Sequence, residues 1–204
     1  MKNILFICTG NTCRSPMAEA VLKEKKPAFP VKSAGIFAHK GARLSKGSEE
    51  VLKQRGLDIN HSSQPVTHDL MRWADIILTM TKEHKQSLML EYPNYGPFIF
   101  TLKEYVVENG DNQWELLKQA YSTLEDKKAV FLQKNKKKYD SSIELEQALH
   151  KELSEEVELI KEIESNLPNV DISDPFGGNM SVYEKTLAEI EKHIELLIQT
   201  IENE

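Results

Sequence analysis

Eight consecutive residues near the amino terminus, Cys8 to Ser15, combine a nucleophile with groups that bind an anion. The segment reads CTGNTCRS, and it lies between an apolar run at 4–7 and a helix-forming run after Pro16. A loop that joins a strand to a helix aims backbone N–H groups and the positive end of a helix dipole at one point, where anions bind. Arg14 adds a planar fork of donors for phosphate oxygens, and a cysteine in such positive surroundings loses its proton easily. The segment therefore predicts a phosphatase nucleophile, Cys8, that faces a bound phosphate.

The other residues of this loop receive supporting roles. We expect Cys8 to attack phosphorus and form a phosphocysteine, while Ser15 donates a hydrogen bond to its sulfur and Asn11 bonds across the loop. Ser15 is also the predicted N-cap of the helix, with Pro16 at its first position. The alternative is that Cys8 and Cys13 are ordinary buried residues of a strand–turn–helix. The N–H groups from Thr9 to Arg14 and the Arg14 side chain are expected to hold the phosphate oxygens. The candidate phosphate- or substrate-binding residues of the loop are Thr9, Gly10, Asn11, Thr12, Cys13 and Ser15.

A phosphatase of this kind also needs an acid for the leaving group, and Asp174 is the best candidate. It begins the segment DPFGG, in which Pro175 restricts Asp174 to an extended backbone and the two glycines allow a tight loop. We expect Asp174 to protonate the leaving group and then to activate the water that hydrolyses the phosphocysteine. Alone, DPFGG is an ordinary turn, and the Cys8 loop is what makes it a candidate.

The elements that must position these two loops alternate along the chain. Four short segments with strand character are separated by helical segments, which predicts an α/β fold with a four-stranded parallel sheet and helices on both faces. The predicted strands are 4–7, 31–33, 75–80 and 98–100, and the predicted helices are 17–23, 45–55, 67–73, 81–90 and 183–201.

The segment 113–167 differs from the rest, because it has no glycine or proline and is dominated by Lys, Glu, Gln and Leu. Helical spacing of its apolar residues, with a break and a capping box from Ser141 to Glu144, predicts two helices that form a hairpin. We therefore expect one domain, 1–204, that carries a helical hairpin at 113–167. A surface insertion whose ends are close costs little stability. We favour a tolerated insertion that has some binding role, for a protein partner that the sequence does not name.

Composition bounds the function further. The 204 residues carry a net charge of -6, and the pI is near 5.6, which argues against nucleic acid as a general partner. No apolar stretch reaches spanning length, so we expect no membrane association and a cytoplasmic location. Two cysteines fit a reducing compartment, and six scattered histidines give no ligand spacing for a metal. We expect no metal and no cofactor.

These motifs resemble those of the low-molecular-weight protein-tyrosine phosphatases. The resemblance rests on Cys8-x5-Arg14-Ser15, on Ser33-Ala34-Gly35 and on the late Asp174-Pro175, and it covers roughly 1–111 and 171–204. Chain order is informative, because the acid precedes the nucleophile in the larger tyrosine phosphatases and follows it here. The resemblance implies the phosphotyrosine protein phosphatase I-like fold and phosphorylated proteins as substrates.

Within that family, the chain is most similar to the bacterial protein-arginine-phosphatase branch. That branch has Thr at the position of Thr12, where tyrosine-specific members have a bulkier apolar residue. It also has DPFGG, here 174–178, where tyrosine-specific members have aromatic residues after the Asp-Pro, whereas the hairpin at 113–167 is not part of the family pattern. By this resemblance, Thr12 favours phosphoarginine by helping to place the attacking water, Phe176 walls the guanidinium pocket, and a protein-arginine kinase opposes the enzyme. It also implies that Cys8 and Cys13 form a protective disulfide under oxidation. Thr12 as a mere packing residue and Cys13 as a passive one remain alternatives.

Three other functions compete with this interpretation. Phosphotyrosine specificity is disfavoured by Thr12 and by glycines rather than aromatic residues at 177–178. An arsenate reductase of this fold needs further cysteines, and the chain has none after Cys13, with Met80 and Met89 in the relevant region. A phosphate-binding adaptor that works through the hairpin does not need the nucleophile Cys8.

Overall fold

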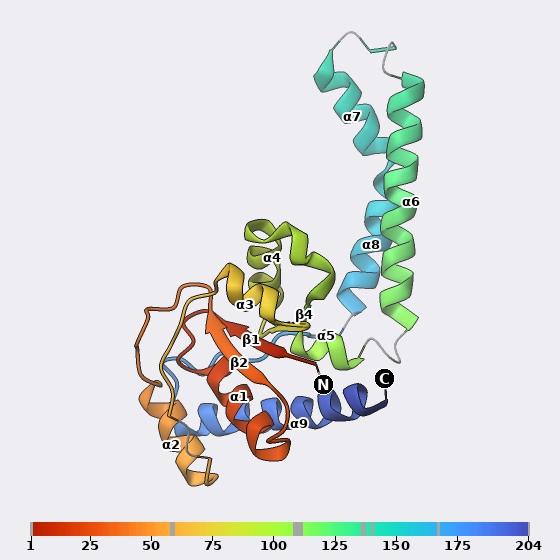
Figure 1. The fold of residues 1–204 in the computed structure, drawn as a ribbon. Coiled ribbons are helices and arrows are strands. Elements are labelled where there is room, and N and C mark those ends of the chain that lie inside the picture. The colour runs from red at the N-terminus through yellow and green to blue at the C-terminus, as the bar shows by residue number, and fades with distance from the viewer. Residues whose placement is uncertain are drawn as a thin grey trace. The chain divides into compact units, whose positions relative to one another are not determined.

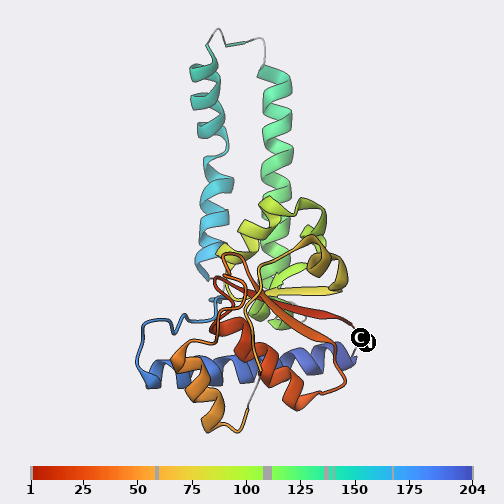
Figure 2. The same cartoon turned by 60° about the vertical axis from the view of Figure 1, so that its left-hand side comes forward.

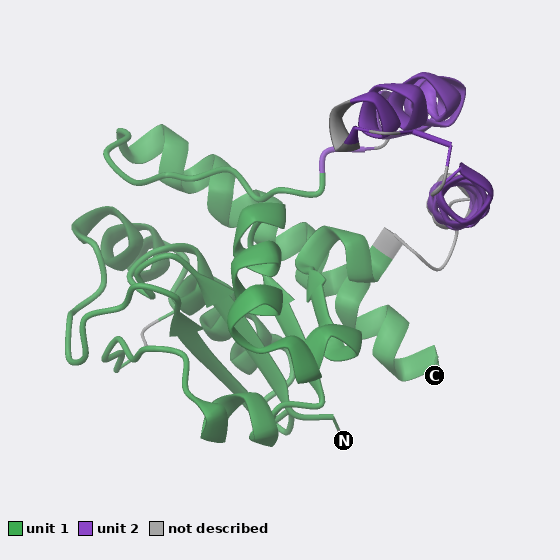
Figure 3. Cartoon of the chain, turned by 90° about the horizontal axis from the view of Figure 1, so that it is seen from above, with its two compact units in different colours: residues 1–109, 170–204 green, residues 110–169 purple. Residues whose placement is uncertain are grey.

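The computed structural model describes residues 2–57, 60–107, 112–135, 138–139, 141–166 and 168–203. Its internal contacts divide the chain into two compact units, which Figure 3 shows in different colours. Unit 1 comprises residues 1–109 and 170–204, and unit 2 comprises residues 110–169. The interpretation of the chain as one domain with an insertion at 113–167 stays a prediction, and each unit is described by itself.

Unit 1 is built on a four-stranded parallel sheet, which confirms the predicted fold class. Its strands lie in the order β2-β1-β3-β4 (Figure 1). The central strand β1 is buried throughout, as expected for a parallel strand that is covered on both faces. The register places Cys8 at the end of β1 beside Gly35 at the end of β2. The strand bounds are Ile4–Cys8 for β1, Val31–Gly35 for β2, Ile76–Thr79 for β3 and Ile99–Thr101 for β4.

Alternate side chains of β1 enter two different cores. Ile4 and Phe6 pack with residues of α1, α2 and α9, whereas Leu5 and Ile7 pack with residues of α3 and α4. Each fully buried large apolar side chain contributes about 1.5–3 kcal/mol. Figures 1 and 2 show α1 and α9 on the same side of the sheet. The helix bounds are Arg14–Lys25 for α1, Lys46–Gln54 for α2, His68–Trp73 for α3, Lys82–Glu91 for α4, Leu102–Val107 for α5 and Met180–Asn203 for α9, with a 3-10 helix η1 at Pro93–Phe98.

Most helix boundaries follow the signals in the sequence. Ser45, Thr67 and Thr81 are N-caps whose side chains accept backbone N–H bonds, and Gly56 follows α2 with φ of 70°. The predicted N-cap Ser15 is wrong, because α1 begins at Arg14. The phosphate loop continues directly into the helix, and the Ser15 hydroxyl bonds inward to the loop instead of capping.

The described residues of unit 2 form the helices α6 at Asn112–Asn135, α7 at Ser142–Glu152 and α8 at Ser154–Asn166. The prediction of one continuous second helix is wrong, since the chain breaks at Leu153 between α7 and α8. Ser154 Oγ donates to the Lys151 carbonyl at 2.9 Å, which satisfies a carbonyl released where α7 ends. Leu167, at the predicted end of this helix, lies outside the described residues. The core of unit 2, formed between α6 and α8, comprises Leu117, Ala120 and Ile160, with Leu124 and Ile163 packed against it.

Across the parts of the chain that the structure describes, no helix is both long and apolar enough to span a bilayer.

Candidate active site

The loop from Cys8 to Ser15 joins β1 to α1 at the carboxyl edge of the sheet. Cys8 is buried, and its Sγ lies 3.1 Å from the Ser15 hydroxyl. The neighbouring strand fixes the start of the loop, because Ile36 N–H donates to the Cys8 carbonyl at 3.0 Å and Phe37 N–H donates to the Thr9 carbonyl at 2.8 Å. The sulfur is therefore held at one point, with a hydroxyl that can stabilise its thiolate form.

Asn11 locks the backbone of the loop. Its φ of 54° lies in the left-handed region, which asparagine tolerates better than most residues. The fully buried side chain donates to Ser15 Oγ at 3.0 Å and to Ser33 Oγ at 2.8 Å, and its Oδ1 accepts from Gln64 N–H at 3.0 Å. These bonds hold a conformation that is otherwise strained, which agrees with the bond predicted across the loop.

Gly35 explains why the second strand must end in a glycine. A Cβ at this position would lie 2.7 Å from the Asn11 nitrogen and 2.7 Å from the Thr9 carbonyl oxygen. Both atoms belong to the backbone and cannot move without reshaping the loop. The Ser33-Ala34-Gly35 motif thus lets the phosphate loop pass directly over the end of β2.

Arg14 and Asp174 meet although they lie 160 residues apart in sequence. The Arg14 side chain is 6% exposed, and its Nη2 donates to Asp174 Oδ2 at 2.7 Å, while the carboxylate is half exposed. Nη1 donates to the Ile172 carbonyl at 3.3 Å. Buried Nε has no hydrogen-bond partner among the described residues, which leaves a donor available for an oxygen of a bound anion.

The acid loop has the tight turn that its sequence predicts. Gly177 has φ of 78°, and Gly178 N–H donates to the Pro175 carbonyl at 2.9 Å. Phe176 N–H donates to Asp174 Oδ1 at 3.2 Å. The two carboxylate oxygens of Asp174 therefore bind different groups, one in its own turn and the other on Arg14.

The two loops enclose a cavity of about 310 Å³. Asn11 and Ser15, which were predicted to bind phosphate or substrate, do not line it but lie behind the loop and support it. Two exposed aromatic rings, Phe37 and Phe176, stand at its edge. The predicted site residues that line the cavity are Cys8, Thr9, Gly10, Thr12, Cys13, Arg14, Asp174 and Phe176, and Phe37, His39 and Ala42 complete it.

His84 is a site residue that the sequence did not indicate. Its Nε2 lies 2.8 Å from Thr9 Oγ1 and its Nδ1 lies 2.9 Å from Thr81 Oγ1. Burial lowers the pKa of His84 to about 4, and the Arg14 cation acts in the same direction, opposed by Asp174 and Asp171. The ring is therefore neutral near pH 7. The available signal was its position in the first turn after β3, beside the edge where the Cys8 loop lies.

Two further supports also lacked a signal in the sequence. The Asn11 carbonyl accepts from Ser63 Oγ and bonds His61 Nε2, each at 2.7 Å. Ser63 and His61 lie in a loop that has no recognisable motif, which is why the sequence did not indicate their role.

Cys13 is a free thiol in the structure, as is Cys8. Its Sγ donates to Ser45 Oγ at 3.1 Å and lies 3.7 Å from Thr12 Oγ1. The predicted disulfide between Cys8 and Cys13 stays a prediction.

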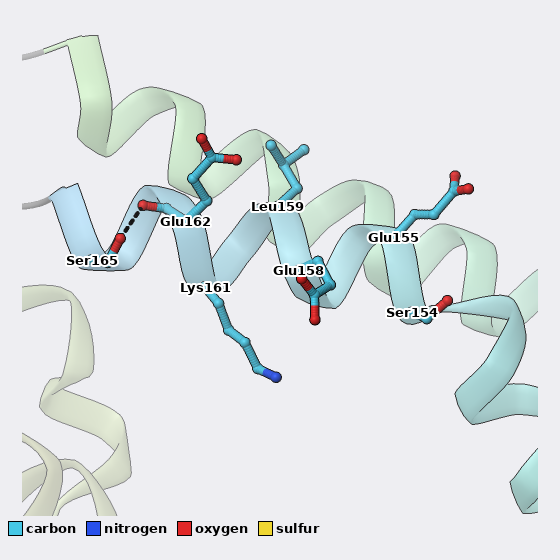
Figure 4. A pocket seen from close by; sticks show the side chains of 7 residues that line it. All are labelled: Ser154, Glu155, Glu158, Leu159, Lys161, Glu162 and Ser165. Atoms are coloured by element: carbon cyan, nitrogen blue, oxygen red, sulfur yellow. Dashed lines mark hydrogen bonds between the residues drawn. The ribbon is translucent and has the colours of Figure 1, made fainter.

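Unit 2 has a hollow of about 750 Å³ along α8, but its side chains do not converge. Figure 4 shows Leu159 and Glu162 projecting from one side of the helix and Lys161 from another. No group of three or more His, Cys, Asp or Glu side chains that could hold a metal occurs within the described ranges. Reactive side chains converge at the cavity in unit 1.

Comparison with known proteins identifies the family. The family described as low molecular weight phosphotyrosine protein phosphatase matches residues 3–154. The chain belongs to this family. The resemblance drawn from the motifs is thereby confirmed, and with it the class of cysteine-dependent phosphatases.

Relatives within the low-molecular-weight phosphatases carry two kinds of name. The protein-arginine-phosphatase of Bacillus subtilis is 44% identical over 114 residues, which span 53% of this chain and 76% of that protein. The low-molecular-weight protein-tyrosine-phosphatase PtpB of Staphylococcus aureus is 42% identical over 108 residues, with coverage of 53% and 76%. Among solved structures, the YwlE arginine phosphatase from Geobacillus stearothermophilus has a TM-score of 0.69 at 29% identity, covering 100% of this chain and 94% of that chain.

Proposed function

We propose that this phosphatase hydrolyses phosphoarginine in proteins through a phosphocysteine intermediate. The observation that carries the proposal is the convergence of Cys8, Arg14 and Asp174 on one cavity. Arginine phosphatases among its relatives at 44% identity support the choice of substrate.

The first step forms a phosphorus–sulfur bond and breaks the phosphorus–nitrogen bond of the substrate. The Cys8 thiolate attacks phosphorus, and Asp174 gives its proton to the departing guanidine nitrogen. Charge that develops on the equatorial oxygens is stabilised by loop N–H groups and by the Arg14 guanidinium. Ser15, 3.1 Å from the sulfur, stabilises the thiolate before attack.

The second step breaks the phosphorus–sulfur bond. Water attacks the phosphocysteine while the Asp174 carboxylate accepts a proton from it, which releases inorganic phosphate and restores the Cys8 thiolate. Because one residue acts first as acid and then as base, the carboxyl group must stay at the cavity throughout the cycle. Thr12, which lines the same cavity, contributes a hydroxyl for placing the water.

Substrate choice depends on the residues around the cavity. A guanidinium is planar and stacks on aromatic faces, and Phe37 and Phe176 offer such faces at the edge. Phosphotyrosine is the second candidate, since an aromatic substrate ring suits the same surfaces and the Staphylococcus aureus relatives are named tyrosine phosphatases. A branched apolar residue at position 12 would remove the hydroxyl, so position 12 is the place to test specificity.

The deciding experiment compares turnover of phosphoarginine and phosphotyrosine peptides of the same sequence under reducing conditions. Wild type is expected to prefer phosphoarginine, and Thr12→Ile to lower this preference by at least about tenfold, whereas Thr12→Ser, which keeps the hydroxyl, retains it. Cys8→Ser should bind phosphate without turnover. If the wild type prefers phosphotyrosine, the assignment to phosphoarginine is overturned. If the wild type binds phosphate but turns over neither peptide, the result supports a non-catalytic phosphate-binding adaptor.

A further inference from the structure

The three residues before Asp174 are held by hydrogen bonds to two parts of unit 1, the segment after β3 and helix α9. Asp171 Oδ1 accepts from Lys82 N–H at 2.7 Å, and Ile172 N–H donates to the Met80 carbonyl at 2.8 Å. Met80 and Lys82 follow β3, which pairs with β1. Ser173 is held from the other side, by Glu189 on α9.

Glu189 binds both Ser173 and a lysine. Its Oε2 accepts from Ser173 N–H at 3.2 Å and from Ser173 Oγ at 2.6 Å, while Oε1 pairs with Lys103 Nζ at 2.6 Å. Lys103 Nζ also donates to the Asp171 carbonyl at 2.7 Å. Burial raises the pKa of Glu189, but bonds from Lys103 and Ser173 outweigh it, so the pKa is lowered and the group is a carboxylate near pH 7.

The bond between Arg14 and Asp174 cannot hold the acid during catalysis. A bound phosphate takes the Arg14 guanidinium, and a protonated Asp174 no longer forms an ion pair with it. What then fixes Asp174 is the Phe176 N–H bond within its own turn, together with the backbone of the segment before it. Ser173 is covalently adjacent to Asp174, and Glu189 is the side chain that binds Ser173 twice.

We propose that Glu189, held by Lys103, is the positioning residue that keeps Asp174 aimed at the leaving group. The inference rests on the proposed role of Asp174 as general acid and does not depend on arginine specificity. Glu189 is not among the residues that line the cavity, and we expect it to act through the backbone of Ser173.

Leaving-group dependence tests this role, because loss of general structure lowers turnover of all substrates alike. 4-Nitrophenolate leaves without much help from an acid, whereas phenolate needs a proton. We expect Glu189→Gln to lower kcat/KM for phenyl phosphate by about tenfold and for 4-nitrophenyl phosphate by less than about threefold. Asp174→Asn should show the same discrimination more strongly.

Two further variants control for folding and for charge. Ser173→Ala removes the hydroxyl bond to Glu189 and a 3.4 Å contact with Thr186 Oγ1 but keeps the backbone N–H bond, so a smaller effect in the same direction is expected even if Glu189→Gln folds poorly. Glu191→Gln lies on the same helix and loses an ion pair with Arg55, away from the acid loop, so both kcat/KM values should stay at the wild-type level. Thermal unfolding of each variant establishes that it is folded.

The outcomes separate the two proposals. If Asp174→Asn discriminates between the two phosphates and Glu189→Gln does not, Glu189 is not a positioning residue. If Asp174→Asn itself lowers both values equally, Asp174 is not the acid, and the proposed mechanism fails together with this inference. In the Asp174→Asn background, adding Glu189→Gln should change the ratio no further.

Discussion

The neutral state of His84 gives a quantitative prediction about stability. The pKa of an unfolded histidine is near 6.5, and in the folded chain burial lowers the pKa of His84 to about 4. Below pH 6.5 the unfolded chain binds a proton that the folded chain cannot bind. The contribution of neutral His84 to the free energy of unfolding is therefore fully present above pH 6.5. It falls as the pH is lowered from 6.5 towards 4, and below pH 4 the protonation of His84 changes the stability no further.

The magnitude follows from the gap between the two pKa values. A difference of about 2.5 in pKa corresponds to about 3.4 kcal/mol at 1.36 kcal/mol for each unit. Residual access of solvent to the ring reduces the expected contribution to about 2 kcal/mol. His84→Gln cannot titrate, so the variant should lose about 2 kcal/mol less than the wild type between pH 7 and pH 4.

Urea unfolding at several pH values measures this difference. The chain has two tryptophans, and in a Trp114→Phe background the remaining one is Trp73 on α3, so fluorescence reports on unit 1. Titrating carboxylates and His193 contribute equally to both proteins and cancel in the comparison. NMR titration of the His84 ring, with a midpoint near 4, gives a direct second measurement.

Parallel loss of stability in the two proteins would refute the reasoning. A midpoint near 6.5 in the NMR titration would mean that the ring is hydrated or that its contacts with Thr9 and Thr81 favour the cation. Either result would remove the claim that a neutral imidazole supports the phosphate loop.

Three other predictions concern single contacts. Gly35→Ala places a Cβ 2.7 Å from two loop backbone atoms, and kcat/KM for an aryl phosphate should fall by about 100-fold. Gly96→Ala, whose nearest atom is the end of a methionine side chain at 3.7 Å, is the matched control and should keep full activity. Lys85→Met leaves the buried carboxylate of Glu104 without its ion pair, which should lower the free energy of unfolding in urea by about 3 kcal/mol. Thr67→Ala removes the N-cap of α3 and should cost about 1 kcal/mol in the same measurement, with Thr67→Ser close to wild type.

The fold and the nucleophile loop could be predicted because their signals are local. Cys8 to Ser15 and the flanking strand and helix are consecutive, so spacing alone shows what they form. Asp174 was predictable for a different reason, since a proline and two glycines around a carboxyl group indicate a tight turn. Local sequence was therefore enough to identify each loop, whereas the contact between the two loops required the structure.

The supports of the site could not be predicted, because their partners are distant in sequence. His84 reaches Thr9 across 75 residues, and nothing next to either residue specifies that contact. Glu189 lies 16 residues after Ser173 on a helix whose apolar stripe is its only clear pattern. Ser15 was wrongly assigned as a cap because its hydroxyl instead bonds Asn11 and the Cys8 sulfur within the same loop, and also the Ala34 carbonyl of β2.

The ion pair between Arg14 and Asp174 means that the guanidinium already has an anionic partner from its own chain. A phosphate that bonds Arg14 through Nη2 then exchanges with the Asp174 carboxylate there, while it adds a partner at Nε, which has none among the described residues. The affinity for an oxyanion therefore depends on how much more strongly Arg14 interacts with that oxyanion than with the Asp174 carboxylate. Under the proposed mechanism, Asp174→Asn removes the general acid, and because it also removes the competing charge it should bind inorganic phosphate more tightly than the wild type.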